Sequence, residues 1–269
     1  NQFLMMFKGV LKKMIVELDN TVNYFLDFGD DFILMNSLIG RSLKLNHIGF
    51  ECLNCKSDQI LYRQGFCKNC FFEIPSTAEW IMKPELSKAH LNIEERDLSY
   101  EKEIQLKPHI LYLAFSSSVK VGVTRESQVP FRWIDQGAIK AVEIARFPNR
   151  YLAGISEVSL KDYFTDKTNW REMLKVDKTD INLELKIAEC ISNIPNEAKK
   201  SIIKKFHSTL SINYPVEKYP SNPKSLNLIK QSEYQGKLVG IKGQYLIFDD
   251  ENVFNIRSNE GVLVELSLS

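Results

Sequence analysis

Two closely spaced pairs of cysteines constrain the fold of this chain more than any other feature of its sequence. Cys52 and Cys55 form one CxxC pair, and Cys67 and Cys70 form another. Two residues between thiolates allow both sulfurs to reach one tetrahedral ion from a tight turn, and a second turn supplies the other two ligands. The residues between the pairs, 60–66, are typical of a hairpin. The pattern therefore predicts a zinc ribbon.

A ligand set made only of sulfur predicts a structural zinc ion. Four protein ligands leave no coordination position open for water, so the ion would stabilise a segment too small to fold by burial alone. A redox role for each CxxC pair is the alternative, but two pairs at this spacing favour metal. Cys190 stands apart in an apolar segment, where we expect a buried core residue.

The bulk properties indicate several small modules without a membrane span. The chain has 269 residues and a formal net charge of +1. It lacks the run of about 20 apolar residues that a spanning helix needs, and the apolar residues 3–7 are too few for a signal peptide. We expect a cytoplasmic protein with no membrane partner. Any polyanion would have to be bound by a local patch. The lysine-rich segment 199–205 is one candidate, although a solubilising helix face is the simpler interpretation.

The order of strand-like and helix-like segments predicts an α+β protein. We expect the C-terminal strands to pair with the N-terminal ones in one shared sheet or barrel, because chain termini often lie close together. Periodicity predicts helices over 181–194 and 195–206. The expected segments are an N-terminal β module (1–50), the zinc ribbon (51–73), a charged connector that is mostly loop with one short helix (74–107), an α/β domain with following helices (108–210), and a C-terminal β module (211–269).

A hairpin predicted near the middle of the chain bears several polar side chains. Two apolar runs, 109–114 and 119–125, are separated by serines, which favour turns. Tyr112, Lys120 and Gly122 lie within these runs, Arg132 begins the next predicted helix, and Glu157 lies in a helix predicted over 153–164. A tyrosine, an arginine and a carboxylate on one small unit suit the binding of a divalent metal and a phosphodiester.

These residues are similar to a known nuclease pattern. Residues 108–175 resemble the GIY-YIG nuclease superfamily. Its motifs correspond to Leu111–Tyr112, the segment 120–124, the helix arginine Arg132, the glutamate Glu157, and Asn169–Trp170 where the domain ends. Ile110 replaces the glycine of the first motif, and Lys120 replaces the tyrosine of the second.

The resemblance implies a role for each residue of the predicted site. Glu157 would hold Mg²⁺ or Mn²⁺, and Arg132 would neutralise charge on the phosphoryl group. Tyr112, aided by Lys120, would take a proton from the attacking water or orient it. The substrate-binding residues would be Gly122, which lets the strand approach the substrate closely, with Arg125, Lys167 and Asn169.

Ordinary structural roles are alternatives for some of these side chains. Tyr112 alternates with apolar neighbours and suits a core position equally well. Lys120 suits a strand edge, where a lysine deters aggregation. His109 follows Pro108, and we expect it to be a turn residue rather than a second base.

The whole chain also resembles an uncharacterised bacterial family, DUF2797. That family joins a zinc ribbon to segments like 82–87, 128–138 and 166–170 of this chain. The second resemblance brings no established activity with it.

The sequence is compatible with three functions. The leading hypothesis is metal-dependent hydrolysis of DNA or RNA. The second is a binding module that has lost cleavage, in which Lys120 and the arginines bind phosphate and Tyr62, Phe66 and Phe71 of the ribbon stack on bases. The third is a zinc-ribbon scaffold for protein partners, which accounts best for the near-neutral charge. The sequence contains no dinucleotide fingerprint, Walker loop or HExxH motif.

Overall fold

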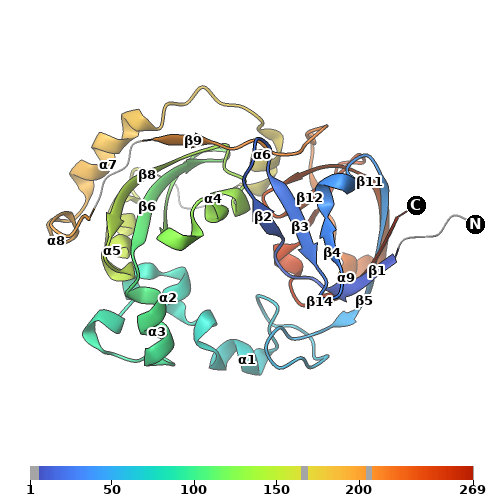
Figure 1. Ribbon diagram of the computed structural model, residues 1–269, viewed down its shortest axis with the longest axis horizontal. Coiled ribbons are helices and arrows are strands. Elements are labelled where there is room, and N and C mark those ends of the chain that lie inside the picture. Colours follow the sequence, from blue (N-terminus) through green and yellow to red (C-terminus); the bar gives the residue numbers. More distant parts are fainter. Residues whose placement is uncertain (1–5, 165–168, 204–207, 269) are drawn as a thin grey trace, which may run out of the picture. The chain divides into compact units, whose positions relative to one another are not determined.

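The structure is a computed structural model that describes residues 6–164, 169–203 and 208–268. It confirms the predicted α+β class, with strands gathered in three sheets and short helices around them (Figure 1). No helix within these ranges combines the length and the apolar character that crossing a bilayer requires.

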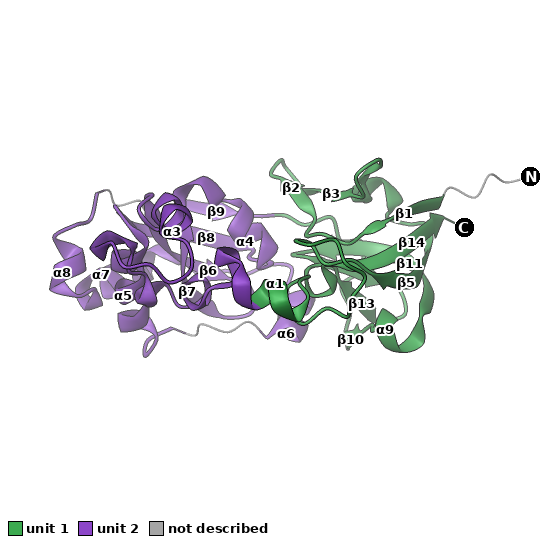
Figure 2. Cartoon of the chain, turned by 90° about the horizontal axis from the view of Figure 1, so that it is seen from below, with its two compact units in different colours: residues 1–71, 213–269 green, residues 72–212 purple. Residues whose placement is uncertain are grey.

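The chain divides into two compact units (Figure 2). Unit 1 is discontinuous and comprises Asn1–Phe71 together with Asn213–Ser269, whereas unit 2 is the continuous segment Phe72–Ile212. Unit 1 therefore contains the predicted N-terminal β module, nearly all of the C-terminal one and most of the ribbon. Unit 2 contains the connector and the α/β segment.

Unit 1 is built mainly from strands. Its elements are β1 (Met6–Val10), β2 (Ile15–Glu17), β3 (Asn23–Asp27), β4 (Phe32–Leu34), β5 (Ser42–Phe50), β10 (Lys224–Ser225), α9 (Leu228–Gln231), β11 (Glu233–Lys242), β12 (Tyr245–Phe248), β13 (Asn252–Asn255) and β14 (Val262–Leu268), and α1 (Lys68–Glu73) starts at its boundary.

Strands from the two ends of unit 1 alternate in one seven-stranded sheet. Its order is β1-β14-β5-β11-β12-β13-β10, so β5 from the N-terminal segment lies between two C-terminal strands. Leu45 illustrates the arrangement, because it pairs with Leu266 on one side and with Tyr234 on the other. The expected pairing of the terminal β modules is confirmed. Within the described residues, β1 and β10 lie at the two edges of this sheet.

A smaller sheet, β2-β3-β4, is tied to the C-terminal strands by one buried side chain. The amide of Gln244 accepts a hydrogen bond from the Met14 backbone N–H at 2.8 Å and donates to the Met14 carbonyl at 3.2 Å. Alternation along β3 buries Tyr24 and Leu26 against the core, as period-two patterning requires.

Unit 2 combines a four-stranded antiparallel sheet with helices. Its elements are α2 (Glu79–Met82), α3 (Leu98–Gln105), β6 (His109–Phe115), β7 (Val119–Arg125), α4 (Phe131–Asp135), β8 (Lys140–Phe147), α5 (Arg150–Leu160), α6 (Trp170–Lys175), α7 (Ile187–Asn193), α8 (Asn196–Lys199) and β9 (Thr209–Ser211).

The predicted hairpin is confirmed as β6 and β7, in a sheet of order β7-β6-β8-β9. One face of the hairpin, including Leu111, Leu113 and Val121, packs with α5 and α7 in the main core of the unit. On β6, Tyr112 alternates with these residues and contacts Trp133 of α4, with ring centroids 5.8 Å apart. Both faces of the hairpin are therefore covered.

Several predicted boundaries were wrong. The connector contains α2, α3 and three short 3₁₀ turns, where mostly loop with one short helix was expected. The helix α5 begins at Arg150 rather than at residue 153, because the Asn149 side chain accepts a hydrogen bond from the Leu152 N–H and caps it. Instead of a regular hairpin, the ribbon has a single bridge between Arg63 and Phe66.

The two helices predicted after α6 are shorter than their apolar periodicity indicated. The regular helix α7 begins only at Ile187, after a 3₁₀ turn, and α8 ends at Lys199. Pro195 separates them, since proline disfavours a helical conformation in the residue before it. Residues 204 and 205 of the lysine-rich segment lie outside the described residues.

Candidate functional site

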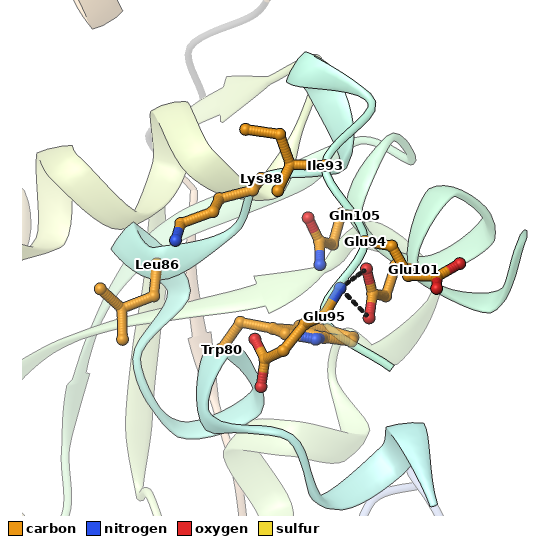
Figure 3. Close-up of a pocket in the computed structure, with 8 residues that line it drawn as sticks. All are labelled: Trp80, Leu86, Lys88, Ile93, Glu94, Glu95, Glu101 and Gln105. Carbon is orange, nitrogen blue, oxygen red and sulfur yellow. Dashed lines mark hydrogen bonds between the residues drawn. The ribbon is translucent and has the colours of Figure 1, made fainter. Parts of the chain in front are cut away.

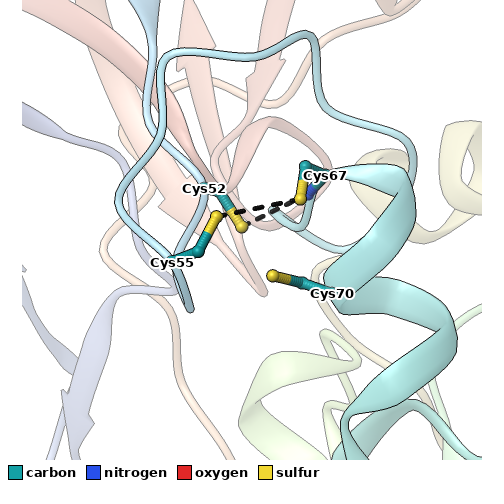
Figure 4. A group of neighbouring side chains, drawn as sticks. All are labelled: Cys52, Cys55, Cys67 and Cys70. Carbon is teal, nitrogen blue, oxygen red and sulfur yellow. Dashed lines mark hydrogen bonds between the residues drawn. The ribbon is translucent and has the colours of Figure 1, made fainter.

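The four paired cysteines converge in unit 1. Cys52 and Cys55 follow the end of β5. Cys67 immediately precedes α1, and Cys70 lies in its first turn. Their sulfur atoms all lie within 4.8 Å of one another (Figure 4). Two tight turns bring them together, and the Cys67 N–H donates a hydrogen bond to the Cys52 sulfur at 3.3 Å. The sequence prediction of four converging thiols is confirmed.

The geometry of this cluster fits one tetrahedral metal ion. A zinc ion with Zn–S bonds of about 2.3 Å places its sulfur ligands about 3.8 Å apart. The Cys55 and Cys67 sulfurs are 3.8 Å apart. The Asn54 side chain donates to the Cys70 sulfur at 3.3 Å, the kind of outer contact that orients a metal ligand. The cluster can hold a structural metal such as zinc.

The electrostatics of the thiols agree with this geometry. Hydrogen bonds from the Ser57 hydroxyl and backbone lower the pKa of Cys55 to about 6. The Asn54 amide lowers the pKa of Cys70, but burial and the neighbouring cysteines outweigh it and raise that pKa to about 12. Four crowded thiols therefore resist full ionisation on their own, and a divalent cation would relieve this resistance.

In unit 2, Tyr112 occupies the centre of the predicted site. It lies opposite Gly122 in the β6–β7 pair and is 1% exposed. Its hydroxyl donates a hydrogen bond to Gln136 Oε1 at 3.0 Å, and the side chain of Arg132 is hydrogen-bonded to it. Burial is the main reason that the pKa of Tyr112 is raised, while the charge of Arg132 opposes the shift. Tyr112 is thus a buried, neutral phenol.

Glu157 lies within electrostatic range of Tyr112 and Arg132, although three different elements carry these residues. Burial raises the pKa of Glu157 to about 7, the charge of Lys161 lowers it, and that of Glu85 raises it. The positive charges of nearby Arg150 and Arg132 also lower this pKa. The structure therefore brings together three of the four residues predicted to be catalytic around a carboxyl group that changes charge near neutral pH.

Two members of this cluster, Arg150 and Glu85, were missed in the sequence. Arg150 donates hydrogen bonds to the backbone carbonyls of Trp80 at 3.2 Å and Ile81 at 2.8 Å. Gly154 of α5 faces the backbone of Glu85, where an added Cβ would lie 2.4 Å from the Glu85 nitrogen. Glu85 lies within the segment 82–87. The resemblance of this segment to an uncharacterised family was the one sequence signal that pointed to Glu85.

The remaining predicted residues lie in varied environments. Lys120 is only 4% exposed and follows Val119 in β7, while Arg125 ends that strand opposite His109. The Asn169 side chain caps α6 by accepting hydrogen bonds from the backbone N–H groups of Arg171 and Glu172. This structural role explains an asparagine at this position. Lys167 lies outside the described residues.

His109 was expected in a turn, which is wrong. It is fully buried as the first residue of β6, and its Nδ1 lies 2.8 Å from the carbonyl of Lys107. Burial, followed by the charges of Arg150 and Arg125, lowers its pKa to about 3. His109 is therefore neutral at physiological pH.

A small cavity of about 80 Å³ lies within the connector (Figure 3). Two of the polar side chains that line it, Glu101 and Gln105, are buried and accept hydrogen bonds from backbone N–H groups. Glu101 accepts from the N–H groups of Glu95 and Arg96, and Gln105 accepts from that of Ala89. These bonds explain how a connector rich in charge and proline adopts one conformation.

Comparison with curated proteins and comparison with solved structures each find no match. A family model does match, over residues 40–264. The match includes the four-cysteine cluster and the unit 2 cluster around Glu157. Because it covers most of the chain, the protein belongs to DUF2797, a family described as "Protein of unknown function".

Proposed function

We propose that this protein hydrolyses phosphodiester bonds of nucleic acid in unit 2 and carries one structural zinc ion in unit 1. The observation that supports hydrolysis best is the convergence of Tyr112, Arg132 and Glu157 from β6, α4 and α5. These are residues for which the GIY-YIG resemblance implied roles. The four thiols described above support the zinc ion.

Each side chain has a role that its surroundings permit. Arg132 offers a planar group of N–H donors to phosphoryl oxygens and neutralises charge that develops on them. Glu157 is an oxygen donor suited to a hard cation such as Mg²⁺ or Mn²⁺. When bound, such an ion would polarise the phosphoryl group and lower the pKa of a coordinated water.

Tyr112 is better suited to orientation than to proton removal. A phenol that acts as a base must ionise, and burial raises the pKa of this one. Its hydrogen bonds join Gln136 to Arg132, so it fixes the guanidinium that would face the substrate. We assign Tyr112 to positioning in this proposal, in place of the base role that the resemblance implied.

The second candidate is nucleic-acid binding without cleavage. It is favoured by the burial of Tyr112 and Lys120, which are 1% and 4% exposed. Side chains enclosed in this way can stabilise a binding surface without reaching a scissile bond. In this case the arginines contact phosphates, and exposed Tyr62 of the ribbon, with Arg63 5.3 Å from its ring centroid, supplies a stacking surface.

The deciding experiment measures cleavage of labelled single- and double-stranded DNA and RNA by zinc-loaded protein with Mg²⁺ or Mn²⁺. Glu157→Ala is the test variant, and Glu172→Ala, an exposed glutamate of α6, is the matched control. Cleavage that requires the metal and is lost only in Glu157→Ala supports hydrolysis. Salt-sensitive binding without cleavage supports the second candidate. Equal cleavage by both variants would reveal a contaminating nuclease.

A further inference from the structure

The strands β2, β3 and β4 of unit 1 form a small sheet with an inner and an outer face (Figure 1). The inner face carries Val16, Tyr24, Leu26 and Ile33, which are all buried. Period-two alternation places the other side chains of these strands on the outer face. The burial patterns agree, because buried and less buried positions alternate in all three strands. The outer face is therefore where this sheet meets solvent.

Apolar side chains form a row across the outer face. The strand register pairs Ile15 with Phe25 and Phe25 with Leu34, so each strand contributes one residue to the row. Phe32 adds a second aromatic ring, which stacks on that of Phe25 with ring centroids 5.1 Å apart. Ile15 is 48% exposed, Phe32 60% and Leu34 39%. Single exposed apolar residues are ordinary on a protein surface, but a contiguous group of them is typical of an interaction site.

The charges around this apolar row are predominantly negative. Residues 15–34 contain no lysine, arginine or histidine, but five acidic residues: Glu17, Asp19, Asp27, Asp30 and Asp31. On the outer face, Glu17 lies on one side of the row, and Asp27 lies on the other side, where it pairs with Phe32. Lys12 lies 3.4 Å from the Asp27 carboxylate and offsets one of these charges. The apolar row is thus flanked by carboxylates on both sides.

This charge disfavours several occupants of the face. A second copy that packed the same face against this one would bring two acidic surfaces together, which costs free energy. A nucleic-acid strand and an anionic membrane surface are repelled for the same reason. A polypeptide with basic residues on both sides of a short apolar centre complements both the apolar row and the carboxylates that flank it.

We propose that the outer face of β2-β3-β4 binds a basic, apolar polypeptide segment of a protein partner. The apolar centre of the segment would cover Phe25 and its three apolar neighbours, and its basic residues would approach Glu17 and Asp27. Burial of apolar area supplies the attraction, whereas the charges steer the approach and select the partner. The face lies wholly in unit 1 and includes none of the residues assigned to hydrolysis, so its test is independent of the proposed function.

The test uses full-length, zinc-loaded protein and a labelled synthetic peptide in which pairs of lysines flank an apolar centre of valine and phenylalanine. Fluorescence anisotropy measures binding, and wild type is expected to bind this peptide. Two control peptides, one with glutamate in place of lysine and one with serine in place of the apolar centre, are each expected to bind at least about tenfold more weakly. Failure of wild type to bind the first peptide, or equal binding of either control peptide, overturns the proposal.

Variants of the protein test the face itself. Phe32→Thr removes the ring that is 60% exposed but retains a β-branched residue that suits a strand, and it is expected to weaken peptide binding about fivefold or more. Ile60→Thr is the matched control, because Ile60 is 81% exposed in the ribbon outside the face, and it should leave the affinity unchanged. If thermal melting shows that Phe32→Thr is destabilised, Leu34→Thr replaces it. Equal affinity in Ile60→Thr and in a folded variant of the face overturns the proposal.

Charge and self-association are tested separately. Glu17→Gln is expected to weaken peptide binding at low salt and to reduce its salt dependence, whereas Glu233→Gln, which changes an exposed glutamate of β11, should do neither. Equal salt dependence in Glu17→Gln and wild type overturns the role of the flanking carboxylates. Sedimentation without peptide measures association between copies of the chain. A monomer supports a face that is free for a partner, whereas a dimer that Phe32→Thr dissociates assigns the face to a second copy and overturns the proposal.

Discussion

The ring of Tyr112 covers the backbone of Gly122 on the neighbouring strand. A Cβ atom built on Gly122 would lie 2.5 Å from the Tyr112 hydroxyl oxygen and 2.6 Å from its Cζ atom. The tyrosine can reach Gln136 and Arg132 along this path because the facing residue has no side chain. A small residue on β7 thus sets the position of a polar group on β6.

We therefore predict that Gly122→Ala displaces Tyr112 and destabilises unit 2 by about 1–3 kcal/mol, the usual cost of overpacking. Chemical denaturation of wild type and variant measures the change. In Gly122→Ala/Tyr112→Leu the clash is removed, so the added cost of the alanine should largely vanish. An equal cost in both backgrounds would contradict this interpretation.

A second glycine makes a different kind of contact. Gly154 faces the backbone of Pro84 and Glu85 rather than the end of a side chain, and backbone atoms cannot rotate away. Gly154→Ala is expected to cost more stability than Gly122→Ala and to loosen the segment around Glu85. Hydrogen exchange of the amides of residues 80–87 tests this, with Val158→Ala on the exposed side of α5 as control. Unchanged exchange in Gly154→Ala would refute the prediction.

The cysteine cluster predicts a defined metal content. Purified protein should contain one zinc ion per chain, with four sulfur neighbours at about 2.3 Å by X-ray absorption. Cys52→Ser should lose the ion and expose the ribbon to proteolysis. Cys190→Ser is the control, because Cys190 is buried in the core of unit 2 and is not a member of the cluster, and it should retain zinc. Equal zinc content in both variants would exclude the cluster as the binding site.

Glu157 predicts a pH dependence of stability. Its pKa is raised from 4.5 to about 7, mainly by burial, so the folded protein binds this proton more tightly than the unfolded chain. The contribution is fully present below about pH 4.5 and is lost as pH rises toward 7, by on the order of 3 kcal/mol. Glu157→Gln should remove this decline, which denaturation between pH 4.5 and 8 would measure. Parallel pH profiles for wild type and variant would contradict the assignment.

Local sequence patterns carried most of the information that was predicted correctly. The cysteine spacing predicted a cluster of four thiols, because two residues between ligands determine the geometry of each turn. Alternation and the serine turn predicted the hairpin that holds Tyr112 and Gly122. Arg132 and Glu157 were grouped with them because they lie on the same small unit and match a family pattern. Nothing in the spacing of the chain itself brings α4 and α5 together.

Long-range contacts explain what the sequence did not predict. Glu85 lies in a segment rich in charge and proline that indicates loop, and only the close packing of its backbone on Gly154 brings it to the cluster. Arg150 precedes the predicted helix start, so its hydrogen bonds to Trp80 and Ile81 had no local signal. The burial of His109 likewise depends on the helices that cover its sheet.

The strand order of unit 1 has a consequence for the order of folding during synthesis. Both strands that pair with β5 are translated only after the whole of Phe72–Ile212. A nascent chain must therefore keep a nine-residue strand with two unpaired edges while another compact unit is made. All the strands of the unit 2 sheet are available for pairing as soon as unit 2 has left the ribosome. We expect it to fold first, and unit 1 to close when β14 is released.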